Sequence, residues 1–448
     1  MNKLLHNISP MKLLLVGYCS IILLGTLLLS LPIASRGPGG TPISDCFFTA
    51  TSATCVTGLI RFDTYTHWTV FGQLVILAMI QTGGIGFMTI AIMVLVLAKK
   101  KIGLGQRSLM QNSISAPQLG GIVKMAKFIM LGTFAVEAIG AFLLSFVFVP
   151  ELGWKRGIYF SIFHSVSAFC NAGFDLMGGI SGQFSSLTNY VGNIYLNVVI
   201  MLLIFVGGLG FFVWYDLGKN RFRFRKLTLQ SKMVLSISIS LVLLGALGIL
   251  IVEQGHEMYA GMSLKDQLLA SFFQSVSART AGFNTSDLSI MTDSGKLIMI
   301  CLMLIGGSTG STAGGIKTTT FWVLCISIFA TFGRKKNIEA FGRRMEENIT
   351  RTASCIFMTY LLLIMGVSII ISSVENLPMM TVLFETTSAM ATVGLSFGVT
   401  PTLGMLSKML LAFLMICGRV GSITMLLAFA SDKRVISSRL PLEKLQVG

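Results

Sequence analysis

The 448-residue sequence has little charge: 12% of its residues are Asp, Glu, Lys or Arg, whereas 53% are hydrophobic. Soluble globular domains carry about 25% charged residues. A composition with half that share, and with many apolar runs of about 20 residues, indicates a polytopic α-helical membrane protein. No stretch fits a soluble domain, and no Rossmann glycine fingerprint is present. A nucleotide-sensing domain is therefore expected on a separate chain.

Clustered metal ligands and catalytic sets are also missing from the sequence. The eight cysteines and four histidines are scattered, without CxxC or CxxH spacing. The cysteines lie mostly in apolar segments and are interpreted as small buried hydrophobic residues. No Ser/His/Asp cluster and no HExxH motif occurs, and Glu137 is a lone acidic residue in its apolar segment. The sequence therefore predicts no enzyme and no cofactor in this chain.

The net charge of +16 comes from basic residues that gather in alternate loops. Of the Lys and Arg residues, 24 fall on one side of the expected topology and 8 on the other. This asymmetry is the positive-inside pattern and argues against a nucleic-acid partner. It predicts eight crossings with both termini in the cytoplasm. The main basic runs are Lys99–Lys101, Lys219–Lys226, Arg334–Lys336 and Lys433–Arg434.

One short stretch, Thr51–Leu59, lies between two long apolar segments and recurs three times along the chain. It reads T-S-A-T-C-V-T-G-L, and each copy has small polar residues, one glycine and then Leu or Phe. The glycines are Gly58, Gly173, Gly282 and Gly394, which gives a period of 109 to 115 residues. A near-constant period with the same punctuation indicates a fourfold internal repeat.

Each repeat is predicted as a long helix, a half-helix, a loop and a second long helix. The apolar segment at 43–54 is too short to cross a bilayer of about 30 Å, so it is interpreted as re-entrant. The first helices are expected at 11–31, 123–149, 229–252 and 351–374, the half-helices at 43–54, 157–170, 266–279 and 379–391, and the second helices at 71–98, 190–218, 296–331 and 404–430. The repeats then span 1–110, 111–222, 223–340 and 341–448. The fold class is an all-α polytopic membrane protein, pseudo-fourfold around one central ion pore.

The four glycine loops are interpreted as a cation filter rather than as ordinary extracellular turns. Irregular backbone at membrane depth is tolerated where it lines a water-filled cavity. Backbone carbonyls that face an axis replace the hydration shell of a cation, and glycine permits the backbone angles that this requires. The half-helices also direct the negative ends of their dipoles toward the ion. Four in-phase copies are hard to obtain by chance.

These loops resemble those of the Trk/Ktr/HKT superfamily of potassium-uptake proteins, and the resemblance covers essentially the whole chain. The loops that carry it are C55-V-T-G-L59, C170-N-A-G-F174, R279-T-A-G-F283 and A391-T-V-G-L395. The length and the first helix, which leads directly into the first loop, are similar to the bacterial KtrB type. The resemblance implies a homodimer in the plasma membrane, with a cytosolic ring of nucleotide-binding RCK-type subunits. Glycine in all four loops implies a preference for potassium, although Cys55 stands where threonine is expected.

The resemblance also implies that the backbone carbonyls of the four loops bind K+ as the substrate ion. The expected filter residues are Cys55, Val56, Thr57, Gly58, Leu59, Cys170, Asn171, Ala172, Gly173, Phe174, Arg279, Thr280, Ala281, Gly282, Phe283, Ala391, Thr392, Val393, Gly394 and Leu395. An ion pair between Arg279 and Glu385 behind the filter is a further hypothesis, set against each side chain simply facing water.

A second stretch, Ile305–Thr320, is rich in glycine, serine and threonine at membrane depth, where it is expected to break the helix. The resemblance implies a gate below the filter. A helix-packing motif and a phosphate-binding loop are the alternatives, although the run is one residue off the P-loop pattern and no strand precedes it. The expected gate residues are Gly306, Gly307, Ser308, Thr309, Gly310, Ser311, Thr312, Ala313, Gly314, Gly315, Lys317 and Arg419.

Arg419 stands out when the second helices of the repeats are aligned. Repeats one and two have Gly84 and Gly208 at the position that Arg419 occupies in repeat four. An arginine at mid-membrane is costly and indicates a function. The carbonyls and hydroxyls of the glycine-rich loop, or a carboxylate such as Asp216, are the expected partners.

Two questions stay open at the level of the sequence. The basic loops at 99–107, 219–232 and 334–351 either contact anionic lipid and set the topology, or dock the cytosolic ring. Transport is either gradient-driven or coupled, as in a symporter of potassium with sodium or protons. Transporters usually show two halves rather than four pore units, and no acidic residue is obvious in the pore, which favours the gradient-driven route.

Overall fold

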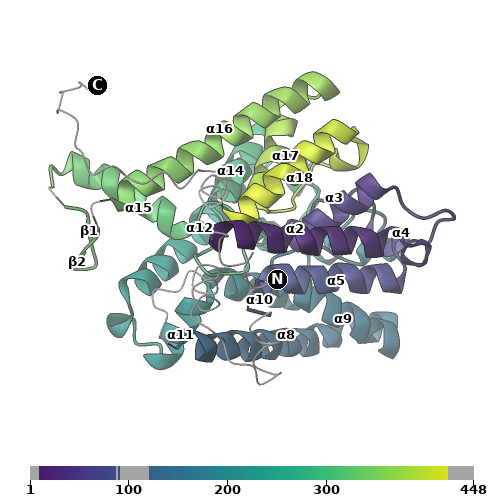
Figure 1. Ribbon diagram of the computed structural model, residues 1–448, viewed down its shortest axis with the longest axis horizontal. Coiled ribbons are helices and arrows are strands. Elements are labelled where there is room, and N and C mark those ends of the chain that lie inside the picture. Colours follow the sequence, from purple (N-terminus) through teal and green to yellow (C-terminus); the bar gives the residue numbers. More distant parts are fainter. Residues whose placement is uncertain (1–9, 87–88, 91–120, 336, 347, 422–448) are drawn as a thin grey trace, which may run out of the picture.

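The computed structural model describes residues 10–86, 89–90, 121–335, 337–346 and 348–421. The basic runs Lys99–Lys101 and Lys433–Arg434, and the predicted repeat boundary at 110, lie outside these residues. The long first helix of every repeat is present close to its predicted place (Figure 1). These helices are α2 (Pro10–Leu29), α8 (Ile122–Leu152), α12 (Leu229–Glu253) and α16 (Ile349–Glu375).

Four short helices occupy the predicted half-helix positions. They are α3 (Ile43–Thr54), α9 (Trp154–Phe169), α13 (Leu264–Ser277) and α17 (Met379–Ala391). The predicted bounds of the first and the last of these helices match those of the structure, and the other two begin two or three residues earlier than predicted. Each of the four packs against the long helix that precedes it. The helix–half-helix–loop order of the repeats is therefore confirmed.

The second helix of each repeat was predicted to be continuous except in repeat three, and this is wrong for the others. The structure has α5 (Val70–Ile85), α10 (Ile194–Leu209) with α11 (Phe211–Lys219), α14 (Asp293–Leu304) with α15 (Thr318–Phe332), and α18 (Met405–Val420). Each break falls at an aligned glycine with positive φ: +87° at Gly86, +93° at Gly210 and +93° at Gly421. Such angles are accessible to glycine, so these residues end the helices.

The breaks change the number of helices that are long enough to span a membrane. Within the described residues, four helices are long and apolar enough to cross, and α10 with α11, bent by 92°, would be a fifth. The eight crossings remain a prediction, because α14 and α15 are individually short and most residues after Gly86 and Gly421 lie outside the described part of the chain.

Short elements connect the helices at both ends. They are η1 (Pro32–Ala34), α4 (Thr64–His67), η2 (Met177–Gly179), η3 (Thr188–Tyr190), η4 (Phe224–Lys226), η5 (Glu257–Tyr259) and η6 (Thr400–Thr402). The strands β1 (Glu339–Ala340) and β2 (Arg343–Arg344) pair antiparallel between α15 and α16. Phe341 and Gly342, both with positive φ, make the two-residue turn between them.

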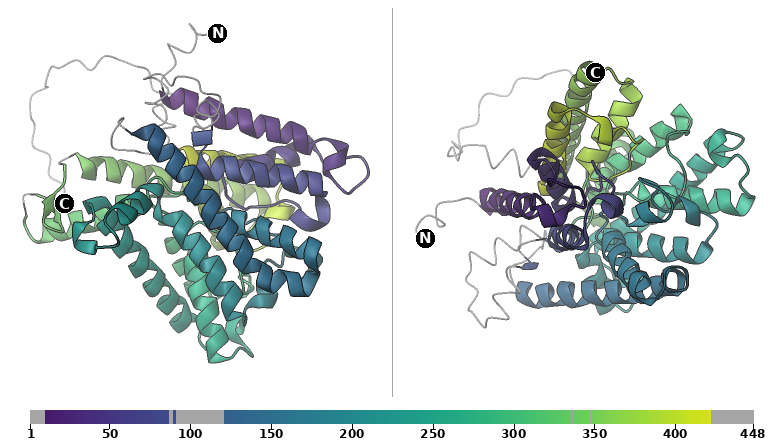
Figure 2. Two further views of the ribbon diagram at one scale, coloured as in Figure 1. Left: turned by 90° about the horizontal axis from the view of Figure 1, so that it is seen from below. Right: turned by 90° about the vertical axis from the view of Figure 1, so that its right-hand side faces the viewer.

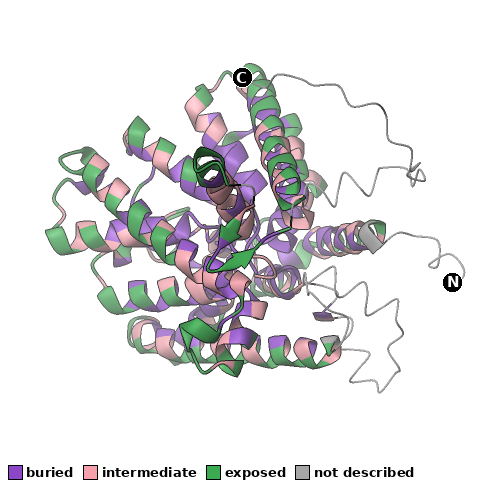
Figure 3. Cartoon of the chain, turned by 90° about the vertical axis from the view of Figure 1, so that its left-hand side faces the viewer, coloured by how far each residue is buried: buried purple, intermediate pink, exposed green. Residues whose placement is uncertain are grey.

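The repeats follow one another around a common centre, so that the end of the chain returns to its beginning (Figure 2). Helix α18 of repeat four packs against α3 of repeat one. A buried ion pair between Lys408 and Asp45 joins these two helices across 363 residues of sequence. Buried residues gather toward the middle of the molecule, and exposed residues lie mostly on the outer helices (Figure 3).

Carboxylates at the ends of two long helices hold the start of the next helix in the same repeat. Glu253, at the end of α12, accepts a hydrogen bond of 2.7 Å from the hydroxyl of Thr292, the residue before α14. Glu375, at the end of α16, accepts hydrogen bonds from Gly404 N (2.9 Å) and Ser407 Oγ (2.5 Å) at the start of α18. These contacts connect the first and second helices of repeats three and four and help to position the loops between them.

Candidate functional site

The four loop glycines meet at the centre of the molecule and form what we call the glycine ring: Gly58, Gly173, Gly282 and Gly394. A Cβ atom added at any of them would meet the carbonyl oxygen of the residue before the next glycine. These contacts are Gly58 to Ala172 (2.5 Å), Gly173 to Ala281 (2.9 Å), Gly282 to Val393 (2.6 Å) and Gly394 to Thr57, which is closer still. The contacts run in one direction and close after four steps, so the loops surround one axis.

The backbone of each loop has the same unusual conformation. The glycines have φ between +69° and +94°, and the residue two positions earlier is also left-handed. These residues are Val56 (φ +57°), Asn171 (+59°), Thr280 (+70°) and Thr392 (+51°). A positive φ is rare for a β-branched residue and signals strain that the surroundings maintain. Because left-handed residues alternate with others, successive carbonyls can face the same side.

A serine near the end of each half-helix anchors its loop, a feature that our sequence analysis missed. The carbonyl of each serine accepts the N–H of the residue before the glycine, at 2.8 to 2.9 Å. The hydroxyls of Ser52 and Ser388 also accept the glycine N–H, at 3.1 and 3.0 Å. The hydroxyls of Ser167 and Ser277 instead donate to Phe174 O (2.6 Å) and Phe283 O. The sequence signal was present, because every copy contains Ser-Ala at this point.

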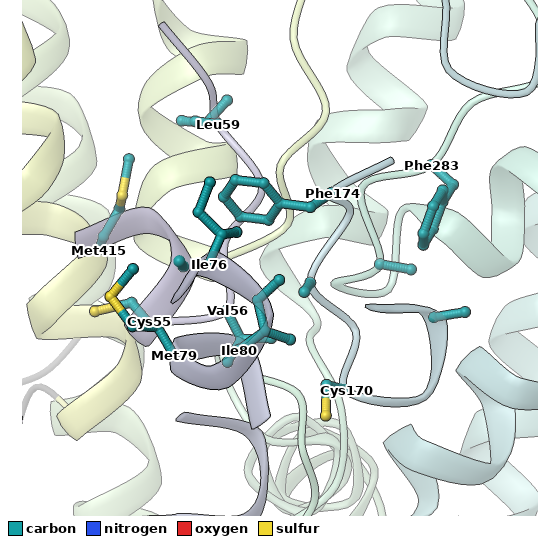
Figure 4. Close-up of a cluster of buried hydrophobic side chains, with 14 of the residues drawn as sticks. Cys55, Val56, Leu59, Ile76, Met79, Ile80, Cys170, Phe174, Phe283 and Met415 are labelled. Atoms are coloured by element: carbon teal, nitrogen blue, oxygen red, sulfur yellow. The ribbon is translucent and has the colours of Figure 1, made fainter. Parts of the chain in front are cut away.

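The residue after each glycine packs away from the ring and into the protein. Leu59, Phe174, Phe283 and Leu395 are all at most 2% exposed. In Figure 4, the first three lie toward one end of the labelled cluster, and Cys55, Val56 and Cys170 lie toward the other. Cys55 and Cys170 are fully buried. The Leu and Phe side chains that follow the glycines pack into the hydrophobic core around the loops. This packing explains why each copy has Leu or Phe at this position.

Polar groups without protein partners line the loops of the ring. Within the described residues, the buried hydroxyls of Thr57 and Thr392 make no hydrogen bond. Buried polar groups are normally satisfied, so these two hydroxyls are exceptions among the loop residues. A pocket of about 100 Å³ lies on the face of the ring formed by residues that follow the glycines, and its lining includes all four glycines. We call this the outer face of the ring. The described residues contain no group of three or more His, Cys, Asp or Glu side chains that could hold a metal ion.

The glycine-rich stretch is a loop between Ile305 and Lys317, as predicted, although the helix resumes at Thr318 and not after Thr320. It lies on the face of the ring formed by residues that precede the glycines. Thr312 Oγ1 donates to Phe169 O at the end of α9 (3.1 Å), and Gly314 packs against Thr392. The loop is not helical, which argues against a helix-packing motif, and in the part of the chain that the structure describes no strand precedes it as in a P-loop.

The same loop fills the break in repeat two. Ser308 N and Thr312 N donate to the carbonyls of Gly208 and Gly207, at 3.0 and 3.3 Å, and Phe211 N donates to Gly310 O at 2.8 Å. The carbonyls that the bend of α10 frees are thereby satisfied by the loop. Lys317 Nζ donates to Ala313 O at 2.8 Å within the loop itself.

Arg419 reaches both the loop and repeat one. Its guanidinium donates to Thr312 O in the loop and to the carbonyls of Gly83 and Gly84 in α5. Of the two predicted kinds of partner, the loop carbonyls are therefore correct. Asp216 is not a partner, because it accepts from Thr228 and Asn220 instead.

The hypothesis of an Arg279–Glu385 ion pair is wrong. Arg279 turns inward, where its guanidinium donates to Ser238 O (3.2 Å) and Gly306 O (3.3 Å). Glu385 turns outward and accepts from Ser396 Oγ (2.5 Å), Phe397 N (3.1 Å) and Thr400 Oγ1 (2.8 Å). Each of the two side chains is hydrogen-bonded to these separate partners, so no ion pair joins them.

An α-helical membrane protein with four half-helices, whose loops close around one axis, is the class that this fold and site define. The family model described as "TrkH: Cation transport protein" matches residues 29–436. The chain therefore belongs to the TrkH family of cation transport proteins, and the resemblance to the Trk/Ktr/HKT superfamily is confirmed.

Characterised relatives match along nearly the whole chain. The potassium/sodium uptake protein NtpJ of Enterococcus hirae is 39% identical over 448 residues, which cover 99% of this chain and 98% of NtpJ. The Ktr system potassium uptake protein B of Bacillus subtilis is 38% identical, over 95% of this chain and 94% of its own length. The crystal structure of the potassium transporter TrkH from Vibrio parahaemolyticus has a TM-score of 0.71 and 17% identity, over 92% of this chain and 84% of that one. This likeness confirms the fold.

Proposed function

We propose that this chain takes up potassium ions across a bacterial plasma membrane, through a filter made by the glycine ring. The observation that carries the proposal is the closed circle of contacts among Gly58, Gly173, Gly282 and Gly394. Carbonyls held around an axis replace the hydration shell of a potassium ion. The names of NtpJ and of the Ktr protein support potassium as the substrate. The predicted repeats at 1–110, 111–222, 223–340 and 341–448 would each supply one quarter of the filter.

The gate is assigned to the loop between Ile305 and Lys317, together with Arg419. The loop lies under the ring and contacts Phe169 and Thr392 at its inner side. Arg419 holds it through Thr312 O, so the loop has one charged anchor from another repeat. Hydrogen bonds to charged groups contribute about 1.5–3 kcal/mol. Loss of this anchor is therefore enough to shift a two-state gate, since 1.4 kcal/mol is tenfold.

The active assembly is proposed as a homodimer on a cytosolic ring of nucleotide-binding subunits, with both termini in the cytoplasm. Two relatives are named as parts of Ktr systems, which supports association with other subunits. The basic segments at 219–232 and 334–351 are the described candidates for docking or for contact with anionic lipid.

Charge reversal at Arg334, Lys335 and Lys336 is expected to weaken co-purification with the cytosolic subunit if this loop docks it. Reversal at Lys296, which lies on the opposite side in the predicted topology, is the matched control. A complex that survives reversal in all the basic loops would place docking elsewhere.

Ion flux into liposomes that contain this chain alone tests the proposed transport. Potassium, rubidium and sodium are compared under the same gradient. We expect potassium and rubidium to enter and sodium to be discriminated against. Sodium flux equal to that of potassium, with normally folded protein, would remove the glycine ring as a potassium filter.

The second candidate is a symporter that couples potassium to sodium or protons. The name of NtpJ, a potassium/sodium uptake protein, is the observation that favours it. Potassium flux that persists after sodium is removed and the proton gradient is collapsed would exclude coupling. Flux that stops in either condition would identify the coupling ion.

A further inference from the structure

The pocket on the outer face of the glycine ring is lined by one equivalent residue from each of the four loops. Its lining includes the residue two positions after each glycine: Ile60, Asp175, Asn284 and Ser396. Because the loops are equivalent, these four residues form a second ring outside the first. Asp175 is the only charged member of this ring, and among the described residues it is also the only charged residue that lines the pocket. A single carboxylate therefore faces a pocket whose lining contains the entire glycine ring.

The carboxylates around this pocket differ in how far the protein satisfies them. Glu385 lies behind the wall and accepts three hydrogen bonds, from Ser396, Phe397 and Thr400. Asp63 accepts from Tyr65 N, Thr66 N and Phe184 N, which fixes it as a support of the outer loops. Both of these carboxylates are therefore structural.

Asp175 accepts fewer hydrogen bonds than Glu385 and Asp63 do. Its Oδ1 accepts one hydrogen bond, from Met177 N at 2.9 Å, and the side chain is half-buried. Burial, together with the nearby Asp63, raises the pKa of the Asp175 carboxyl to about 7, so the carboxylate is the main form above that pH and a bound cation stabilises it. Asn284, in the same ring, donates its amide to Ser286 O at 3.1 Å, which keeps its side-chain oxygen as an acceptor. The pocket of about 100 Å³ has room for a cation with several water molecules. Oxygen ligands and one negative charge at the mouth of a pore are the features that attract cations.

We propose that this pocket is a binding site for a partly hydrated monovalent cation, with Asp175 as its charged ligand, from which ions enter the glycine ring. The inference rests on the proposed function and adds a loading site to it. A cleft lined by one sign of charge raises the local concentration of counter-ions. Asp175 therefore sets the concentration at which transport saturates, whereas the glycine ring sets selectivity.

The experiment measures rubidium uptake into liposomes as a function of external rubidium, at low ionic strength and at about pH 8, where the Asp175 carboxyl is mostly ionised. Asp175→Asn keeps the hydrogen bond from Met177 N and removes only the charge. We expect its half-saturating concentration to rise about tenfold, the low end of electrostatic steering effects. The maximal rate and the rubidium-to-sodium ratio stay unchanged. At about 1 M salt, where the Debye length is roughly 3 Å, the difference from wild type shrinks.

Two further variants sharpen the test. Asp287→Asn removes a carboxylate that is exposed and does not line the pocket, and it is expected to leave saturation unchanged. The double variant Asp175→Asn/Asn284→Asp moves the carboxylate to the equivalent position of repeat three, and it is expected to restore wild-type saturation. If Asp175→Asn does not fold, Asn284→Asp alone adds a second carboxylate to the ring and is expected to lower the half-saturating concentration.

The inference is overturned if Asp175→Asn saturates like wild type, or if Asp287→Asn shifts saturation equally. A double variant that behaves like Asp175→Asn also overturns it. These results leave the proposed function intact, provided that wild-type uptake is saturable and discriminates against sodium. Wild-type protein without saturable rubidium uptake would instead remove the proposed function, and this inference with it.

Discussion

The glycine ring and the layer of broken helices beneath it come from the same four repeats, but only the ring keeps the fourfold pattern. In the ring, each repeat supplies a glycine with positive φ and a serine anchor. In the layer below, repeats one and two have Gly84 and Gly208, repeat three has an extended loop, and repeat four has Arg419. An ion on the axis needs equal ligands, whereas a gate needs one element that moves and one that holds it.

The closure of the ring between the first and last repeats is the feature whose loss we expect to cost most. Lys408→Met removes the close ion partner of the buried Asp45 and leaves it only the longer contact with Arg61, whose Nε lies 4.0 Å from Asp45 Oδ1. Removing one member of a buried pair destabilises by about 3–5 kcal/mol, and the remaining contact with Arg61 places the expected loss at the lower end of that range. Thermal unfolding in detergent measures the effect. The neutral double variant Asp45→Asn/Lys408→Met is the control and should recover most of the loss. A single variant as stable as wild type would show that packing of α18 on α3 closes the ring without the ion pair.

His67 belongs to the same joint, because its Nε2 lies 2.8 Å from Thr41 Oγ1 beside α3. Burial lowers the pKa of His67 below its ordinary value, although Asp45 acts in the opposite direction. A lowered pKa in the folded state means that the neutral ring is favoured there. Its contribution to stability is therefore present above the ordinary pKa of about 6.5 and is lost as the pH falls below it.

Breaking the symmetry of the ring itself is the next largest effect. In Gly58→Ser, the added Cβ meets Ala172 O and the backbone keeps a φ of +94° that serine resists. We expect potassium-over-sodium discrimination to fall by about ten- to a hundredfold, which corresponds to roughly 1.5–3 kcal/mol of lost ion coordination. Competitive rubidium and sodium uptake measures this change.

Gly37→Ser is the matched control, since no atom lies within 4 Å of the added Cβ in the outer loop. Gly58→Ser that retains full discrimination in folded protein would take Gly58 out of the filter.

Variants of the glycine-rich loop and of Arg419 test the role of the asymmetric layer of broken helices beneath the ring. Deletion within Gly310–Gly314 is expected to raise basal potassium flux about tenfold, and Arg419→Ala is expected to raise it less, because the charged hydrogen bond to Thr312 O is one of several anchors. Arg419→Lys keeps the charge but not the fork geometry, so an intermediate flux is expected. Normal protein yield with flux no higher than wild type would assign the loop to packing alone.

Removing a serine anchor of the ring is expected to have the smallest effect on ion discrimination. Ser388→Ala removes the acceptor of Gly394 N–H, and a net hydrogen bond contributes about 1 kcal/mol. We expect a loss of discrimination of about fivefold. Ser373→Ala, which removes an exposed hydroxyl that donates to Ile369 O within α16, serves as the comparison away from the site. Equal losses in the two variants would argue against a specific role for the anchor.

Periodicity and glycine positions were sufficient to predict most of this fold. The half-helices at 43–54 and 379–391 match the structure, because a short apolar run before a glycine has few alternatives in a membrane. The breaks at Gly86, Gly210 and Gly421 were not predicted. A glycine within a long apolar run is compatible with a continuous helix, and only the tertiary contacts decide.

Side-chain partners were less predictable than backbone. Arg419 has few acceptors available at its depth, so its contact with the loop could be predicted. The partners of Arg279 could not be predicted, because the sequence does not show that its guanidinium faces Ser238 O and Gly306 O rather than Glu385. Asp175 was overlooked because it lies beyond the glycine, where a sequence does not reveal which loops share a pocket.

Anomalous diffraction from crystals in rubidium tests the central claim most directly, because it locates the ion independently of flux. The account predicts density on the axis of the glycine ring, among the carbonyls of Thr57, Ala172, Ala281 and Val393. Gly58→Ser crystals should lose or weaken that density. Rubidium found only away from the axis, in protein that discriminates against sodium, would contradict the account.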